Sequence, residues 1–143
     1  RQFEEAPGQV LIQSRQTLRD RLGQSWQVVL FVRPAVSDRA GADRAVSQPR
    51  EVALRLVGFP GQVVFRHPAT LALTASQDQQ WQAADGFATG APGDNVGQYD
   101  LRDLLATLPI DQPLDLQLPL VGETRSLRIP VAVLLEWRDL ARR

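Results

Sequence analysis

The chain has 143 residues, enough for one domain with its own hydrophobic core but too few for two of ordinary size. Sixteen basic residues, all of them Arg, balance sixteen acidic ones, so the chain lacks the excess of cations that nucleic-acid binding requires. The absence of Cys excludes disulfides, thiolate nucleophiles and cysteine-ligated metal centres.

The N-terminal residues differ in composition from the rest of the chain. Residues 1–8 are charged and end in Pro7-Gly8, which predicts a flexible leader before one β-rich domain over residues 9–143. The chain starts at Arg1 and has no Met, which fits either a removed signal segment, with or without a lipid anchor, or an arbitrary start point. No apolar run approaches the roughly 20 residues that span a bilayer, so we expect no transmembrane segment.

The first strongly patterned region is a hairpin. Val10 to Leu18 reads as a strand, and a turn at residues 20–23 leads into a second strand that ends near Arg33. One face of the second strand is entirely apolar, which predicts that it is buried: Trp26, Val28, Leu30 and Val32. The other face mixes polar and apolar residues. Residues 34–49 have no sustained period and predict a loop.

Short strands and one helix are expected in the middle of the chain. The strands are predicted at residues 51–58, 62–66, 70–74 and 80–84. Residues 85–99 contain four Gly and one Pro and predict a long irregular loop, a kind of segment that is often functional. Asp100 is expected to cap a short helix over residues 100–108, which Pro109 ends.

The clearest alternation runs from Leu114 to Trp137 and predicts a C-terminal hairpin. The favoured pairing places Leu118 opposite Leu127, with a four-residue turn at 121–124. Residues 131–135 are all apolar, which predicts that the last strand continues into the centre of the fold. Together these elements predict a mainly β fold: an antiparallel β-sandwich or a partly open barrel of about seven or eight strands with one short helix.

No catalytic or cofactor signature stands out. His67 is the only histidine, the GxSxG pattern of hydrolases is absent, and a surface position is therefore expected for it. Asp85, Asp94 and Asn95 in the long loop could supply oxygen ligands to Ca²⁺, but their spacing matches no EF-hand. We therefore predict no catalytic residue, no cofactor and no metal, and keep these three residues as weak calcium candidates.

Aromatic residues in loops and arginines near a hairpin end are the candidate contacts for a partner. Arg and aromatic side chains dominate interface hot spots, whereas aromatics in phase with a strand face, such as Trp26, usually belong to the core. The candidate partner-binding residues are Arg15, Arg19, Arg21, Phe59, Phe87 and Tyr99. For the arginines the alternative is a solvated face paired with Asp20.

Several short sequence motifs, spaced along the chain, resemble those of one known family. They include the block from Ser14 to Asp20, the block from Leu54 to Gly61, His67-Pro68, the block from Gly97 to Asp100, and Glu136-Trp137. The chain resembles an uncharacterised family of small cyanobacterial proteins that are exported to the periplasm or the thylakoid lumen. The resemblance implies a location beside photosynthetic membranes and an accessory or assembly role with photosystem complexes; it transfers no chemistry to any residue.

The sequence therefore leads to three functional hypotheses. The first is a non-enzymatic exported binding module that docks on a membrane protein complex. The second is a small-ligand or Ca²⁺-binding protein that uses the 85–99 loop. The third is a hydrolase, which would require His67 and a carboxylate to converge in an apolar pocket.

Overall fold

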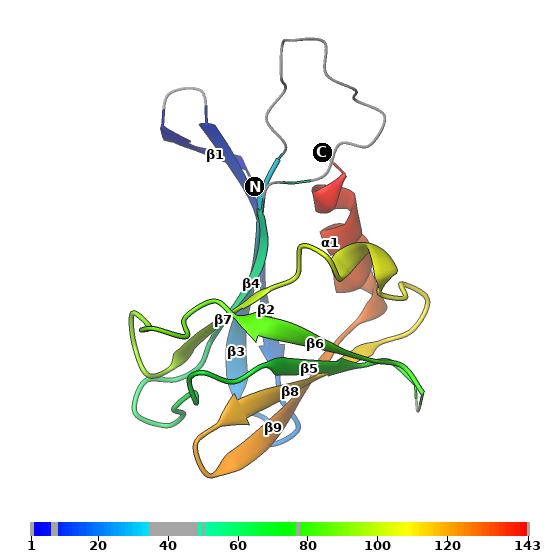
Figure 1. Ribbon diagram of the computed structural model, residues 1–143. Helices are drawn as coiled ribbons and strands as arrows, with labels where there is room; N and C mark the ends of the chain where they lie inside the picture. Colours follow the sequence, from blue (N-terminus) through cyan, green and yellow to red (C-terminus); the bar gives the residue numbers. More distant parts are fainter. Residues whose placement is uncertain (1, 7–8, 35–48, 50, 77, 143) are drawn as a thin grey trace, which may run out of the picture.

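The computed structural model describes residues 2–6, 9–34, 49, 51–76 and 78–142, which form one curled antiparallel sheet and a C-terminal helix (Figure 1). Nine strands hydrogen bond in the order β1-β2-β3-β4-β7-β6-β5-β8-β9. Their bounds are β1 Gln2–Ala6, β2 Gln9–Arg19, β3 Ser25–Arg33, β4 Glu51–Val57, β5 Leu71–Thr74, β6 Gln80–Asp85, β7 Val96–Asp100, β8 Leu114–Leu120 and β9 Glu123–Ile129. The predicted mainly β, partly open barrel is confirmed.

The sheet curls until strands near its two ends meet. The backbone N–H of Arg21, directly after β2, donates to the carbonyl of Ser126 in β9 at 3.2 Å. Helix α1 (Val131–Ala141) packs beside β2, where the side chain of Gln16 donates to Glu136 at 2.8 Å. In the described part of the chain, no helix has the length and apolar composition needed to cross a membrane.

The core fills the inside of the curl, as the alternating patterns predict. The inward residues of β3 (Trp26, Val28, Leu30 and Val32) are at most 1% exposed. Leucines of β8 face them from the other side of the curl, and Leu134 and Trp137 of α1 complete the cluster. Strands β3, β4, β5 and β8 contribute alternate side chains to this core because successive residues of a strand point to opposite faces.

Three predicted segments differ from the structure at the level of the backbone. Gln2–Ala6, expected to be a loose leader, forms β1 and pairs with β2; residues 1, 7 and 8 lie outside the described part. Val96–Asp100, of which residues 96–99 fall in the predicted irregular loop, is the central strand β7 between β4 and β6. Within the predicted 62–66 strand, Phe65 forms only an isolated bridge to Leu120. The predicted loop at 34–49 lies outside the described residues except at its two ends.

The predicted helix at 100–108 is wrong. The segment contains only a 3-10 turn, η1 (Leu105–Thr107). The Asp100 side chain accepts from the N–H of Arg102 at 2.9 Å, two residues on, which makes a turn and not a helix cap. The leucines of the segment are buried all the same, because Leu101, Leu105 and Leu108 pack into the core from this turn.

The C-terminal hairpin forms, but in another register and with another ending. Leu118 pairs with Arg125 and Leu116 with Leu127, across a two-residue turn at Val121-Gly122 in which Gly122 adopts a φ of 82°. A type of turn that needs positive φ favours glycine there. The predicted continuation of the strand is wrong, because β9 ends at Ile129 and residues 131–141 form α1.

Candidate functional site

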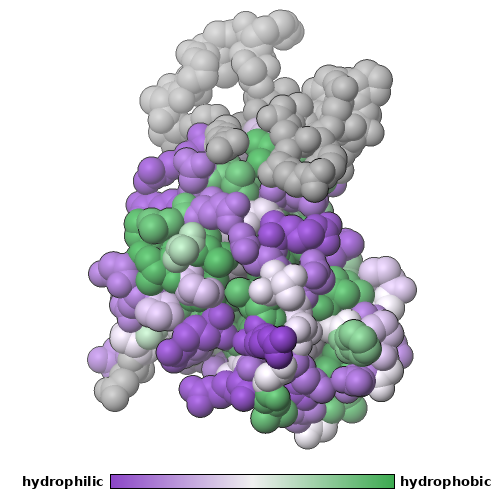
Figure 2. All heavy atoms as spheres, turned by 180° about the vertical axis from the view of Figure 1, so that it is seen from behind, coloured by the Kyte–Doolittle hydropathy of each residue, from purple (hydrophilic) through white to green (hydrophobic). Residues whose placement is uncertain are grey.

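Among the described residues, most of the exposed large hydrophobic side chains lie at one end of the curled sheet. Figure 2 shows apolar (green) patches between polar ones at this lower end of the molecule, seen from behind. Leu22 lies in the β2–β3 turn, Val121 in the β8–β9 turn, and Phe59 and Val64 in the connection between β4 and β5; we call these four residues the hairpin-tip surface. Their exposed fractions are 69% for Leu22, 65% for Phe59, 60% for Val121 and 40% for Val64. Val64 and Val121 are neighbours across a short ladder, since the N–H of Val121 donates to the carbonyl of Val64 at 2.8 Å.

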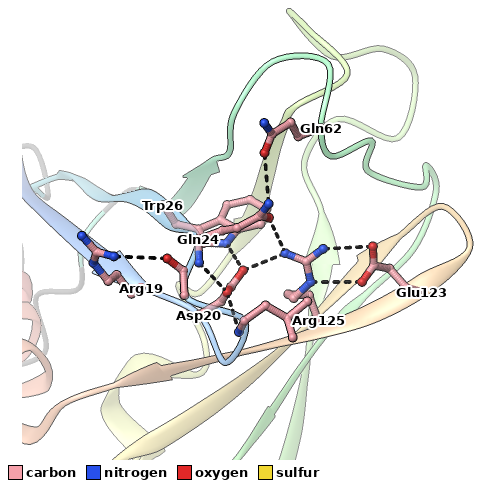
Figure 3. A network of polar contacts seen from close by, with 9 residues as sticks. Arg19, Asp20, Gln24, Trp26, Gln62, Glu123 and Arg125 are labelled. Atoms are coloured by element: carbon pink, nitrogen blue, oxygen red, sulfur yellow. Dashed lines mark hydrogen bonds and ion pairs between the residues drawn. The ribbon is translucent and has the colours of Figure 1, made fainter.

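A buried polar network, which we call the clasp, holds these tips together (Figure 3). Its centre is an ion pair between Asp20 and Arg125, with Nη1 to Oδ2 at 2.8 Å and side-chain exposures of 0% and 7%. The indole N–H of Trp26 donates to the same Oδ2 at 2.8 Å, and Glu123 binds Arg125 through two bonds of 3.0 Å. Residues from the β2–β3 turn, from β3 and from β9 therefore meet at one carboxylate and one guanidinium.

Gln24 extends the clasp to the third tip. It accepts from Arg125 at 2.7 Å and donates to the side chain of Gln62, in the β4–β5 connection, at 3.0 Å (Figure 3). Beside this contact a concavity of about 240 Å³ opens between the tips, lined by Gln24, Ser25, Trp26, Phe59, Gln62 and Val63. The depression thus lies between the β2–β3 turn and the β4–β5 connection, and Phe59 is the one residue of the hairpin-tip surface that lines it.

The clasp also fixes the charge of Asp20. Burial by itself would raise the pKa of this carboxyl, but hydrogen bonds from Trp26, Arg125 and the backbone N–H groups of Gln24 and Leu22 outweigh burial and lower it. The sequence contained one signal of this pair: Arg125 lies in phase with the apolar residues Leu127 and Ile129 of β9. A charged residue at an inward position needs a partner.

The three arginines predicted as partner contacts are all exposed, but they do not lie together. Arg19 and Arg21 flank Asp20 at the β2–β3 turn, and Arg19 donates to the carbonyl of Gly23 at 3.3 Å. Arg15 lies further along β2 and donates to Gln27 at 3.4 Å. The structure therefore brings Arg19, Arg21 and Phe59 to the same end of the molecule and leaves Arg15 outside it.

Phe87 and Tyr99 are placed away from the hairpin-tip surface. Phe87 is half-buried, with the guanidinium of Arg55 5.5 Å from its ring centre and the ring of His67 6.4 Å away. Tyr99 is fully buried at 0% exposure. Beside it only glycine fits at position 97, because a Cβ there would lie 2.8 Å from both the Tyr99 hydroxyl and the ring of Phe65. Tyr99 thus belongs to the core and offers no exposed surface.

A second polar cluster surrounds His67, whose expected surface position is wrong. The side chain of His67 is only 18% exposed, and its Nδ1 lies 2.7 Å from Oδ2 of Asp85, a carboxylate that is 4% exposed. Asp85 also accepts from the N–H groups of Ala69 at 3.2 Å and Phe87 at 2.7 Å. Sequence reasoning selected both residues separately and missed their pairing, because it depends on the register of β6 against distant elements.

The weak calcium candidates do not assemble into a site. Asp85 is engaged with His67, and Asn95 donates to the carbonyl of Gly58 at 2.8 Å. Asp94 contributes its backbone carbonyl, which accepts from the N–H of Phe65 at 2.9 Å. Across the described ranges, no three Asp, Glu or His side chains come together in a way that could hold a metal ion.

The contact between His67 and Asp85 meets only half of the requirement for a hydrolase. An aspartate that holds Nδ1 of a histidine orients the ring so that Nε2 can act as a base. Here, however, Nε2 is buried and makes no hydrogen bond in the described part of the protein. Among the described residues, no hydroxyl lies within hydrogen-bonding distance of this nitrogen. The pair joins the segment after Arg66 to β6.

Comparison with known proteins identifies a family for the chain but assigns no chemical activity to it. No curated protein and no solved structure matches the chain significantly. A family model described as "Protein of unknown function (DUF3122)" matches residues 1–140, nearly the whole chain. The resemblance to a family without assigned function is confirmed at that level. The chain, with its curled antiparallel sheet and clasped hairpin tips, belongs to the DUF3122 family of proteins of unknown function.

Proposed function

We propose that this protein is a non-enzymatic binding module that docks on a membrane protein complex through the hairpin-tip surface. The observation that carries the proposal is the distribution of exposed apolar side chains. Among the described residues, five large hydrophobics are exposed, and all except Leu135 belong to this surface. Single exposed hydrophobics are ordinary, but a group on converging loops marks an interaction surface.

The clasp gives this surface the rigidity that a binding site requires. Loop tips lose conformational entropy when a partner orders them, and this loss weakens binding. Here the tips are already fixed to one another through Asp20, Arg125 and Gln24. A buried ion pair is a poor source of net stability but is well suited to holding distant segments in one arrangement. Preorganisation therefore supports a binding role for the tips.

The composition of the surface indicates the chemistry of the partner. Phe59 is a large exposed aromatic anchor beside a depression of about 240 Å³. Arg19 and Arg21 stand exposed at the same end and would favour acidic groups on the partner. We expect a protein surface with an apolar centre and an acidic rim.

The identity of the partner is the part of the proposal that rests on resemblance. Similarity to small exported cyanobacterial proteins suggests the thylakoid lumen or the periplasm as the location. A photosystem complex, whose assembly or stability the protein would assist, is the first partner to test. That the protein is a binding module and not an enzyme is likewise part of the proposal.

The test combines cross-linking with a matched variant. A photoreactive phenylalanine analogue at position 59 is expected to cross-link to one subunit in detergent-solubilised cyanobacterial thylakoids, whereas the same analogue at position 135 is not. The triple variant Leu22→Ser, Phe59→Ser, Val121→Ser should weaken retention at least about tenfold, because each anchor of a hot spot contributes about 1–2 kcal/mol.

The control is Leu135→Ser, which removes an exposed leucine (48% exposed) from α1 and leaves the tips intact. Because all four positions are exposed, these variants are expected to keep the stability of the parent protein. Equal retention of the triple variant and the parent, or equal cross-linking from positions 59 and 135, would reject the hairpin-tip surface as the docking site.

A further inference from the structure

A pocket lined by three arginines lies at the opposite end of the sheet from the hairpin-tip surface. It has a volume of about 430 Å³, within the range of small-molecule sites. Val52, near the start of β4, contributes to its wall, whereas the hairpin tips follow the end of β4. The other walls come from the segment around η1 and from the last turn of α1, which lie side by side (Figure 1).

The pocket carries positive charge on an apolar floor. Arg102, Arg138 and Arg142 line it together with one acid, Asp103, so the charges of the lining residues sum to +2. Val52 and Leu105 (1% and 6% exposed) form the apolar part with the small side chains of Ala106 and Ala141. This combination suits a ligand that has both an anionic and an apolar part.

The arginines are available for an anion. Arg102 uses its Nε–H to bind the carbonyl of Pro49 at 3.1 Å, which fixes the guanidinium and leaves its terminal N–H groups for a ligand. Neither Arg138, which is half-buried, nor Arg142 spends its guanidinium in a hydrogen bond or ion pair in the structure as described. Arg138 is half-buried, whereas Arg102 and Arg142 are exposed. The planar fork of a guanidinium matches the geometry of a carboxylate or phosphate, so three such groups around one pocket suit an oxyanion.

The position of two arginines at the end of α1 has a simpler explanation that accounts for only part of the arrangement. Cations are favourable at a helix C-terminus because they face the negative end of the helix dipole. That effect explains neither Arg102, which comes from another segment, nor a concavity with an apolar floor. The convergence of three arginines from two elements on one pocket therefore requires a further reason.

We propose that this pocket binds a small amphiphilic anion, with its carboxylate or phosphate head between Arg102, Arg138 and Arg142 and its short apolar chain against Val52 and Leu105. The site does not depend on the hairpin-tip surface, from which it is separated by the length of β4. Loss of partner binding at the tips would therefore leave it unchanged.

The test uses ligands that separate head from tail. Octanoate and octyl phosphate are the probes; acetate supplies a head without a tail, and octyltrimethylammonium supplies a tail with the opposite charge. Titrations followed by amide chemical shifts should show binding of at least one of the two probes with a dissociation constant of about 1 mM or tighter. The largest shifts should fall at residues 102–106 and 138–142. Acetate and octyltrimethylammonium should bind at least about tenfold more weakly.

Two kinds of variant locate the site. Arg138→Gln and Arg142→Gln should each weaken binding about tenfold, whereas Arg15→Gln, which removes an exposed arginine from β2, should have no effect. Ala106→Trp fills the pocket without changing its charge and should abolish binding. The proposal would be overturned if neither octanoate nor octyl phosphate bound, if the cationic probe bound with equal affinity, or if the shifts centred on other residues. Unchanged binding by Arg138→Gln, Arg142→Gln or Ala106→Trp would overturn it as well.

Discussion

Asp20 and Arg125 are 105 positions apart in the sequence, yet their side chains meet at 2.8 Å in a buried ion pair. The contact joins the turn after β2 to β9, the strand at the far end of the sheet order. It therefore closes one end of the curl, where the neighbouring backbones share the hydrogen bond from Arg21 to Ser126. The same contact organises the surface that we propose as the docking site.

Removal of one partner of this ion pair should be strongly destabilising. We expect Arg125→Met to lower the free energy of unfolding by about 3–5 kcal/mol, because it leaves the buried carboxylate of Asp20 without a cationic partner. Urea denaturation at pH 7 measures the change. The control is Arg128→Met, which breaks the exposed ion pair with Asp115 and should have a much smaller effect. Similar losses in the two variants would show that the clasp does not hold the tips.

The same carboxylate should make the protein acid-sensitive. The pKa of Asp20 lies below its ordinary value: burial raises it, but the hydrogen bonds from Trp26, Arg125 and two backbone N–H groups together lower it by more. A group whose pKa is depressed by folding stabilises the protein above its unfolded pKa, and that stabilisation is lost as the pH falls through the folded pKa. The gap in unfolding free energy between the parent and Asp20→Asn should therefore narrow below about pH 4. A difference in unfolding free energy between the two proteins that stays constant from pH 7 to pH 2.5 would contradict this prediction.

Tyr99 should make the protein sensitive to alkali for the opposite reason. Burial raises the pKa of its hydroxyl far above the ordinary value, and the nearby carboxylate of Asp85 adds to the rise while Arg66 offsets part of it. Because the unfolded pKa is about 10, stability should fall as the pH rises above that value. Tyr99 is the only tyrosine, so tyrosinate absorbance near 295 nm reports on it alone.

The expected result is that tyrosinate appears only as the protein unfolds, in step with the loss of circular dichroism. Tyr99→Phe should remove this alkaline dependence. It should cost little stability at neutral pH, since the hydroxyl makes no hydrogen bond to any described residue. Ionisation of Tyr99 in a protein that stays folded would show that the hydroxyl is accessible.

Asp85 should act as a structural anchor. Its carboxylate contacts Nδ1 of His67 and accepts hydrogen bonds from the N–H groups of Ala69 and Phe87. Asp85→Ala therefore leaves these groups without a partner. We expect a loss of about 2–3 kcal/mol in the free energy of unfolding. Asp94→Ala, in the connection that follows β6, is the matched control and should be nearly neutral, because its exposed side chain makes no hydrogen bond to a described residue and only its backbone carbonyl accepts one. Equal stability of the two variants would contradict this role.

The sequence predicted the elements whose pattern is local and missed those that depend on distant contacts. The strands β2, β3, β4, β8 and β9 follow from alternation, because a half-buried strand needs an apolar residue at every second position. The short strand β7 contains Gly97 and lies among glycines, so its composition resembles a loop. It is a strand because β4 and β6 provide partners on both sides. The inward position of Arg125 indicates a buried charge but does not identify Asp20 as its partner, and the contact of His67 with Asp85 has no local signature, since each contact joins segments that are separate in the sequence.

The C-terminal helix shows how one pattern can fit two structures. Val131, Val133, Leu135 and Trp137 alternate as a strand would, but Val133, Leu134, Trp137 and Leu140 also recur at helical spacing, and these four are buried. Pro130 decides between the two, because it ends β9 and its carbonyl accepts from the N–H groups of Val133 and Leu134 in the first turn of α1. A short, uniformly apolar run is ambiguous by periodicity alone.

The helical register predicts opposite outcomes for two residues that a strand would place on the same face. Trp137→Ala should cost about 3–5 kcal/mol of unfolding free energy, since the ring is 0% exposed and its removal leaves a large cavity in the core. Leu135→Ala should change stability by no more than about 0.5 kcal/mol, because the side chain is 48% exposed on the outer face of α1. Urea denaturation of both variants decides the matter. Comparable losses at the two positions would mean that the segment after Pro130 buries alternate residues and that α1 does not pack as described.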